Sequence, residues 1–161
     1  MLLTDLAEAL TEHLNSSPGK WAGDLEVLAK TELDPSKLML PELGVYILPQ
    51  FVDYNTEPTG ARNKVIQALV STLHVSLVVS KVFLELPISD GVANWDEVKV
   101  IQDVRQRAEI WILQFPPIPG LTVAGVDPNA LEELELDNRN FVALTTFSYQ
   151  QSTCGEEDLL P

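Results

Sequence analysis

The sequence is poor in the residues that most often carry out chemistry, and each shortage removes a class of function. Of its 161 residues one is a cysteine, Cys154, and two are histidines, His13 and His74. A single cysteine can form neither an intrachain disulfide nor a cysteine-based metal cluster. The sequence also lacks Gly-rich phosphate-binding loops, His-x-x-x-His and Cys-x-x-Cys spacings, and EF-hand loops. We therefore expect no cofactor and no metal.

Basic residues are scarce as well. Ten Lys and Arg stand against 24 Asp and Glu, which gives a formal net charge of −14. Such a field repels phosphate backbones and anionic lipid surfaces, so we expect neither sequence-specific nucleic-acid binding nor membrane binding. The most apolar stretch, residues 65–83, is interrupted by seven polar residues, whereas a membrane helix needs about 20 mostly apolar ones. We expect a soluble chain without a signal peptide, because no basic segment opens the sequence.

Neither histidine lies in a pattern typical of a catalytic base. His13 is near the end of an acidic amphipathic segment, where we expect a solvated residue at a helix C-terminus. His74 lies on the polar face of a predicted strand, and no Asp or Glu is placed locally to orient its ring. We interpret His74 as a surface or interface residue. Negative charge beside Cys154 disfavours a reactive thiolate, so we predict that the chain is not an enzyme.

Hydrophobic periodicity predicts two helices and four strands. Their order is helix, strand, strand, helix, strand, strand, over residues 3–14, 44–54, 64–83, 95–115, 121–126 and 141–149. Short connections then favour an α+β fold, an antiparallel sheet with two helices packed on one face. A chain of this length and hydrophobic content suits one core, so we assign residues 1–149 to a single α+β domain. Residues 150–161 form an acidic, mobile C-terminal tail in this prediction.

Several shorter segments are less regular. Residues 25–29 are compatible with a short strand, and residues 127–134 with a turn or a short helix. Pro49 predicts an edge or a bulge in its strand, because proline cannot donate a ladder hydrogen bond. Trp21 falls in a predicted loop and is a candidate interface anchor.

The strand predicted over residues 64–83 is longer than a small domain needs. A continuous strand of that length would span about 65 Å. We expect its first part, Ala61 to Val70, to project with the preceding loop as an arm that a neighbouring subunit covers. The alternative is that a bulge breaks the run into two ordinary strands.

The order of these elements resembles that of small virion proteins at the head–tail junction of long-tailed phages, most closely the tail terminators. The resemblance rests on an opening helix, a strand that leads through a polar excursion into the long alternating strand, a helix between prolines, and a closing strand. These are residues 2–10, 44–48 with 64–83, 95–115 and 141–149. The stretch 16–43 is longer than a minimal terminator needs, and the acidic tail is extra.

The resemblance implies a homohexameric ring that caps the tail tube and joins it to the head connector. Its partners would be copies of itself, the tail tube protein and a head-completion or connector protein. DNA would pass through without sequence-specific binding, in a virion tail or neck assembled in the host cytoplasm. A ring forms from heterologous contacts whose rotation closes.

For these contacts we predict two sets of residues. The inter-subunit set lies on the arm, where Arg62 and Lys64 would meet acids on a neighbour; its members are Arg62, Lys64, Ile66, Ala68 and Val70. The set facing the lumen or a partner is acidic: Asp127, Glu132, Glu133, Glu135 and Asp137. Three other functions stay open. One is a head-completion or neck protein between portal and tail, the second is a small acidic protein-binding module, and the third is an enzyme with a carboxylate site.

Overall fold

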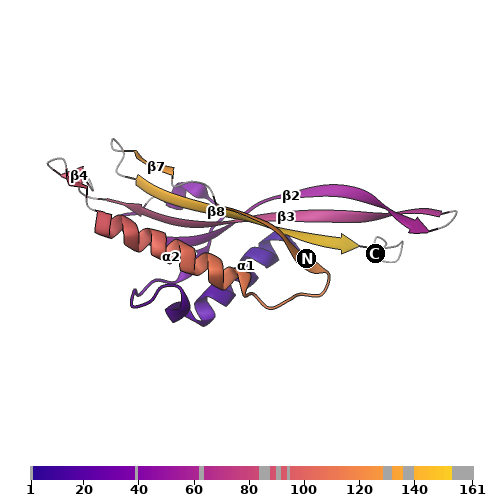
Figure 1. The fold of residues 1–161 in the computed structure, drawn as a ribbon, viewed down its shortest axis with the longest axis horizontal. Coiled ribbons are helices and arrows are strands. Elements are labelled where there is room, and N and C mark those ends of the chain that lie inside the picture. The colour runs from indigo at the N-terminus through magenta and orange to yellow at the C-terminus, as the bar shows by residue number, and fades with distance from the viewer. Residues whose placement is uncertain are drawn as a thin grey trace.

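The computed structural model describes residues 2–38, 40–61, 64–83, 88–89, 92–93, 95–128, 132–135 and 140–153. These form an α+β fold in which two α-helices lie on one long mixed sheet, drawn out along its strands (Figure 1). In chain order the elements are α1 (Leu3–Ser16), η1 (Pro18–Lys20), β1 (Ala29–Thr31), η2 (Pro35–Leu38), β2 (Gly44–Ala61), β3 (Lys64–Val82), β4 (Ile88–Ser89), β5 (Val92–Ala93), α2 (Trp95–Leu113), β6 (Leu121–Pro128), β7 (Glu132–Glu135) and β8 (Asn140–Thr153). No helix of the described residues is long and apolar enough to cross a membrane.

The main sheet has the strand order β1-β2-β3-β8-β6, with β7 also paired to β8, while β4 and β5 form a separate two-stranded ribbon. The prediction of a purely antiparallel sheet is wrong, because β1 pairs with β2 in parallel, from Ala29 opposite Val45 to Thr31 opposite Ile47. The cause is an anchor on α1. The amide side chain of Asn15 donates to the carbonyl oxygen of Ala29 (2.9 Å) and accepts from its N–H (2.8 Å), which fixes where β1 joins the sheet.

The core lies between one face of the sheet and both helices, as the sequence predicts. β3 buries Leu73, Val75, Leu77 and Val79 on this face, the alternate positions of the strand. The helices contribute residues at helical spacing: Leu6, Leu10 and Leu14 from α1, and Val98, Ile101, Val104, Ala108 and Ile112 from α2. Phe141, Ala143, Phe147 and Tyr149 complete the core from β8.

The other face of the sheet is covered only in part. A second, smaller cluster joins Leu38 of η2 to Tyr46, Leu48 and Val78. Two hydrogen bonds hold this cover to β3: Ser80 Oγ donates to the carbonyl oxygen of Leu38 (2.7 Å), and the N–H of Val82 donates to that of Leu40 (2.8 Å). The covered part lies where β2 begins and β3 ends.

Several boundaries differ from the predictions, including the end of β2, which continues to Ala61 instead of residue 54. The short strand falls at β1, Ala29–Thr31, instead of residues 25–29, and β6 continues to Pro128. Strand β7, Glu132–Glu135, takes up the last part of the segment 127–134, where a turn or a short helix was predicted, so that prediction is wrong there. β8 continues to Thr153, which pairs with Leu69, so residues 150–153 are part of the sheet and not of a tail. Residues 154–161 lie outside the described residues.

Candidate assembly interface

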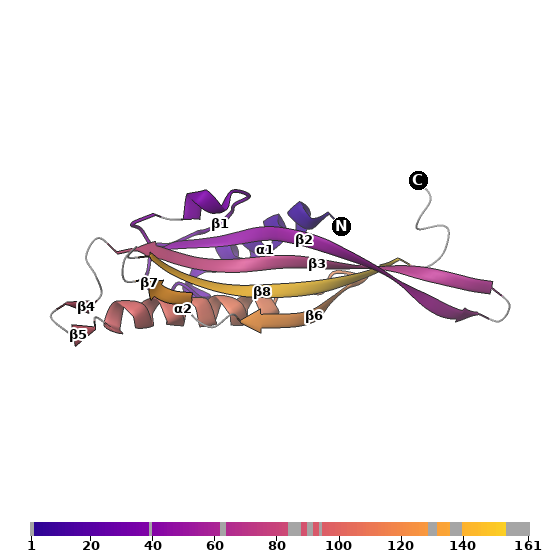
Figure 2. The same cartoon turned by 90° about the horizontal axis from the view of Figure 1, so that it is seen from above.

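Strands β2 and β3 form a hairpin that continues beyond the rest of the sheet (Figure 2). Their pairing runs without interruption from Phe51 opposite His74 to Ala61 opposite Lys64. The pairing of β8 with β3 ends at Leu69 opposite Thr153. Among the described residues, 57–61 and 64–68 therefore pair only with each other; we call residues 57–68 the arm.

The projection of this hairpin confirms that part of the sequence prediction, although Leu69 and Val70 still pair with β8; cover by a neighbouring subunit stays a prediction. The alternative of two strands separated by a bulge is wrong. β3 is continuous over 19 residues. The bulge lies in β2 instead, between Pro49 and Phe51, where the proline predicted it. The bulge shifts the alternation of β2, so that Val45 and Ile47 face the helices before it and Val52 faces them after it. The alternation of β3 is unchanged.

The sheet also has two edges without a described partner strand. β1 covers β2 only from Val45 to Ile47, so from Leu48 onward no described strand lies beside the outer side of β2. At the far side, β6 is the last strand of the order. Both edges lie at the same level, since Val126 pairs with Phe147, Phe147 with Val75 and Val75 with Pro49. An unpaired edge is a template for another strand.

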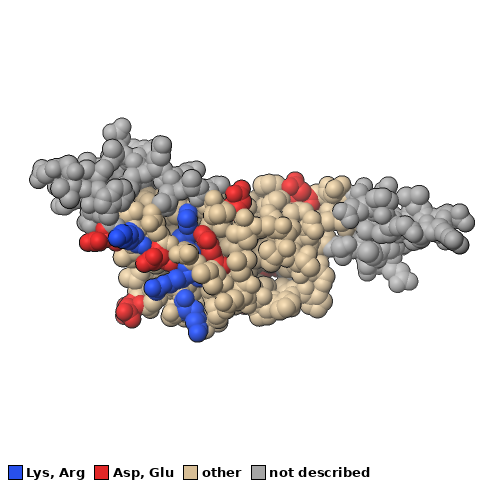
Figure 3. All heavy atoms as spheres, viewed as in Figure 1, with Lys and Arg blue, Asp and Glu red and all other residues tan. Residues whose placement is uncertain are grey.

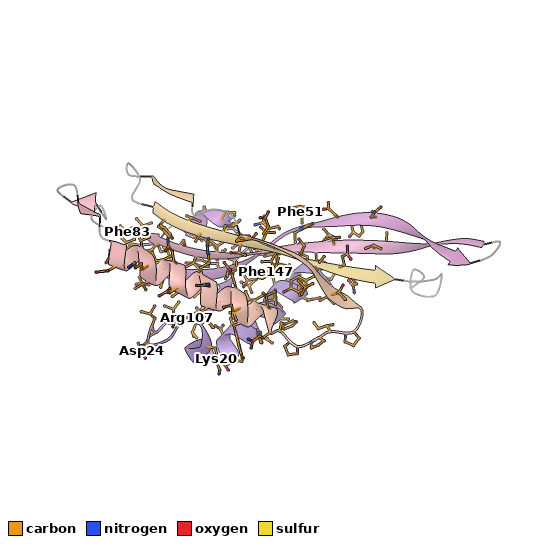
Figure 4. The ribbon with its side chains drawn as sticks, viewed as in Figure 1. Lys20, Asp24, Phe51, Phe83, Arg107 and Phe147 are labelled. Carbon is orange, nitrogen blue, oxygen red and sulfur yellow. The ribbon has the colours of Figure 1, made fainter. Side chains whose placement is uncertain are left out.

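Apolar side chains are exposed on both edges. On β2, Phe51 is 53% exposed and Tyr54 is 69% exposed. On β6, Val123 and Val126 are exposed as well. Figure 4 shows Phe51 and Phe147 on opposite faces of the sheet, with Phe147 between the sheet and the helices. Exposed aromatic residues at an open edge are typical of a surface that a partner covers.

His74 has partners that the sequence did not reveal, and the prediction that no acid orients it is wrong. Its Nε2 lies 2.9 Å from Asp53 Oδ2 on β2, and its Nδ1 lies 2.9 Å from Ser148 Oγ on β8. The ring of Phe51 stacks on the imidazole with centroids 4.3 Å apart. These residues are 21 and 74 positions apart from His74 in sequence, so only the register of three strands brings them together.

A serine, a histidine and an aspartate in contact invite comparison with a nucleophile, base and acid. A neutral ring satisfies both contacts when Nε2–H donates to Asp53 and Nδ1 accepts from the Ser148 hydroxyl. However, Ser148 lies in a strand paired on both sides, with His74 of β3 and Gly125 of β6. Ser148 therefore lies inside a strand and not at a helix N-terminus or a nest, where backbone N–H groups are directed at an oxyanion. The geometry favours a cross-strand polar contact on the open face.

His13 and Trp21 also differ from their predictions. His13 is not a solvated residue: its Nε2 donates to the carbonyl oxygen of Trp111 (2.6 Å), and Trp111 Nε1 donates to that of His13 (2.9 Å). The two rings stack 4.7 Å apart, which joins the ends of α1 and α2. Trp21 is fully buried and donates to the carbonyl oxygen of Leu14 (2.8 Å). It belongs to the core, because η1 turns the chain back under α1.

The structure places the predicted interface residues as follows. The backbones of Lys64, Ile66 and Ala68 lie in the arm. Val70 lies just inside the body and is 8% exposed in the single chain, while Arg62 lies outside the described residues. The role of this set between subunits stays a prediction.

The predicted acidic set lies along one side of β8. Asp127 is exposed near the end of β6, and the backbones of Glu132, Glu133 and Glu135 lie in β7, which pairs with β8 farther along. Asp137 lies outside the described residues. In the part of the chain that the structure describes, no three His, Cys, Asp or Glu residues are grouped so that they could hold a metal ion. A lumen or partner role for the acids also stays a prediction.

Charge is unevenly distributed over the face seen in Figure 3. Lys and Arg side chains gather, among several acids, over the half of the molecule that carries α2. The described surface between α2 and the arm is mostly uncharged in this view. Salt bridges in the α2 half include Arg105 with Glu109 (3.2 Å). On this face, the half next to the arm thus presents fewer charged side chains to water.

Comparisons with known proteins add one structural likeness. No protein-family model matches the sequence, and no curated protein matches it. Among solved structures, the chain is similar to the sheath/tube terminator of an extracellular contractile injection system (PVC) in its extended state. The TM-score is 0.48 and the sequence identity is 15%. The likeness covers 97% of this chain, which spans 59% of the length of that terminator chain.

Proposed function

We propose that this chain is a structural subunit of a phage tail, a tail terminator that forms a ring, caps the tail tube and joins it to the head connector. The arm is the observation that carries the proposal. Two strands that pair only with each other are marginally stable in water. An arm of this kind persists when a neighbouring subunit covers it, so the working form is an assembly.

The two open edges support a ring over a symmetric dimer. They are different surfaces, one on β2 and one on β6, at opposite sides of the same sheet. A contact between two different surfaces is heterologous, and copies joined in this way close into a ring when the rotation permits. The resemblance in element order suggests six copies, with the tail tube protein on one side and the connector on the other.

The mechanism is geometric and needs no turnover. One face of the ring matches the last ring of the tube, and the opposite face offers no further site for tube protein, so polymerisation stops. The net charge of −14 suits a conduit that DNA crosses without being retained. In this role the protein resides in the virion tail or neck after assembly in the host cytoplasm.

The test is assembly of the purified chain, alone and with the tube protein encoded in the same genome. Negative-stain images should show rings with a central opening, and the rings should sit on tube ends and limit tube length. Unchanged tube length would contradict the terminator role. Rings that bind heads and not tails would identify a head-completion protein, and a monomer with one soluble partner would identify an acidic binding module.

A further inference from the structure

A hollow of about 280 Å³ lies at the end of the sheet opposite the arm. Residues 26–30 and 40–46 contribute its lining, on either side of the start of β2. Its walls include the apolar side chains of Val27, Leu28, Leu40 and Leu43. These residues belong to the stretch 16–43, which is longer than a minimal terminator needs.

The stretch that lines the hollow exposes several large apolar side chains. Four of the twelve exposed large hydrophobic residues of the described chain are leucines within this one stretch: Leu25, Leu28, Leu33 and Leu40. Leu28 alone is 59% exposed. Of these four, Leu28 and Leu40 line the hollow. Isolated exposed leucines are ordinary, but two that line one hollow are typical of a surface that another protein covers.

The rim of the hollow is acidic. Glu26 and Glu42 line it, and Lys30 is the cation in the lining. Burial raises the pKa of the Tyr46 phenol at its base, and the charges of Glu32 and Glu42 raise this pKa further. The electrostatic potential at the phenol is therefore negative, which favours a cationic occupant.

The hollow is held in shape by contacts to the body. The carbonyl oxygen of Leu40 accepts from the N–H of Val82 on β3, and the N–H of Glu32 donates to the carbonyl oxygen of Ile47 on β2 (3.1 Å). Asn15 fixes Ala29 on the other wall. An occupant can therefore bind without first ordering these walls.

We propose that this hollow receives the arm of a second copy of the chain. The arm sequence carries two cations, Arg62 and Lys64, at its tip, next to the apolar Val65 and Ile66, and one acid, Glu57, at its base. The tip therefore complements an apolar hollow lined by Glu26 and Glu42. The chain's own arm cannot reach it. The hollow lies at the start of β2 and the arm at its end, 17 residues or about 55 Å further along the strand.

The contact is heterologous, because the arm of one copy meets the opposite end of the next. Each copy therefore offers one arm and one hollow. Copies joined in this way are displaced along their strands, so this contact is an alternative to side-by-side pairing of the β2 and β6 edges, which lie at the same level. The inference rests on the self-association in the proposed function but not on tube capping. It supplies the acids that Arg62 and Lys64 were predicted to meet on a neighbour.

Charge reversal tests the contact. Glu26→Lys with Glu42→Lys, and separately Arg62→Glu with Lys64→Glu, should each raise the concentration for half-assembly about tenfold or more, because like charges then meet. Mixing the two variants should restore assembly, since in an alternating assembly the basic arm of the first meets the acidic hollow of the second and the acidic arm of the second meets the basic hollow of the first. Glu8→Lys with Glu12→Lys, on the exposed side of α1, makes the same charge change away from the hollow and should leave assembly unaltered. Mass photometry over a concentration series measures all four.

Cysteine trapping gives a second readout that does not depend on charge. In a Cys154→Ser background, one tagged copy carries Leu28→Cys and a differently tagged copy carries Val65→Cys or Ile66→Cys. Mild oxidation should yield a covalent dimer containing both tags with at least one of the two arm positions. Leu113→Cys, exposed on α2, should yield none with either arm variant.

The outcomes separate this inference from the proposed function. Rings that form normally with reversed charges, and no trapping at either arm position, would overturn the contact while leaving the ring in place. A wild-type chain that stays monomeric would overturn both. Trapping and charge rescue without any effect on tubes would support the contact and contradict the terminator role.

Discussion

The two ends of the sheet differ in how far their faces are covered. At the end where β2 begins, both faces are covered, one by the helices and one by the segment around Leu38. Toward the arm the cover stops, Phe51 and Tyr54 are exposed, and finally two strands pair only with each other. The covered end accounts for the stability of one copy, whereas the uncovered end is where we propose that a second molecule binds. Stability and assembly should therefore be separable by mutation.

Phe147→Ala should have the largest effect on the free energy of unfolding. The side chain is 1% exposed at the centre of the core, and removing a buried phenylalanine costs about 3–5 kcal/mol. Urea unfolding followed by circular dichroism measures the loss. A cost below about 1 kcal/mol would mean that the helix-covered face of the sheet is not the stabilising part.

Thr145→Val should cost less, about 1.5–3 kcal/mol, since it removes a hydrogen bond to a charged group. Thr145 is fully buried and donates to Glu109 Oε1 at 2.7 Å, while Glu109 also pairs with Arg105. Thr146→Val is the matched control on the opposite face, where the contact to Ser76 is longer, 3.3 Å. Equal unfolding free energies for the two variants would contradict the difference between the faces.

Tyr149→Phe should remove a dependence of stability on alkaline pH. Burial raises the pKa of this phenol far above its ordinary value of 10.0. The phenol therefore ionises less readily in the native state than in the unfolded chain. Its contribution to the free energy of unfolding is complete below pH 10 and is lost as the pH rises further, by about 1.4 kcal/mol per pH unit. The hydroxyl also has no hydrogen-bond partner among the described residues, so the variant should be no less stable at pH 7. Unfolding series at pH 7 and pH 10.5 check both points, and parallel losses in the two proteins would refute this assignment.

Phe51→Ala should have the smallest effect on a single copy, about 1 kcal/mol or less, because half of the ring is exposed and its stacking on His74 is the main loss. Its effect on assembly should be larger than its effect on folding. Comparison with Phe147→Ala, the same substitution at the other face, by urea unfolding and by mass photometry isolates the two roles. Normal assembly of the Phe51 variant would remove this side chain from the interface.

The sequence predicts those helices and strands in which burial of one face sets a regular spacing of apolar residues. The alternation of Leu73, Val75, Leu77 and Val79 and the helical spacing of Val98, Ile101 and Val104 both survive in the structure. The direction of β1 could not be predicted, because it depends on Asn15 reaching a strand 14 positions away. The partners of His74 were missed for a similar reason, since strand register and not local spacing brings Asp53 and Ser148 to its ring.

The candidate interface was predictable in outline only. The length of the apolar strand indicated an arm, and the proline indicated the bulge. The exposure of Phe51 and the acidic hollow could not be foreseen, because each depends on where the cover of the second face ends. Trp21 illustrates the opposite error: a loop position suggested an interface anchor, but a short turn places its ring in the core.

The most direct test of the account is a shortened arm. Replacing residues 58–67 by Asn-Gly removes four residues from each strand, so that Glu57 and Ala68, which already pair, flank a favoured two-residue turn and the remaining side chains keep their faces. We predict that urea unfolding of this variant gives the wild-type free energy within about 1 kcal/mol, while mass photometry shows monomers where the wild type forms rings. Rings of unchanged mass in the shortened variant, or a wild type that is itself monomeric at high concentration, would contradict the claim that the arm joins the copies.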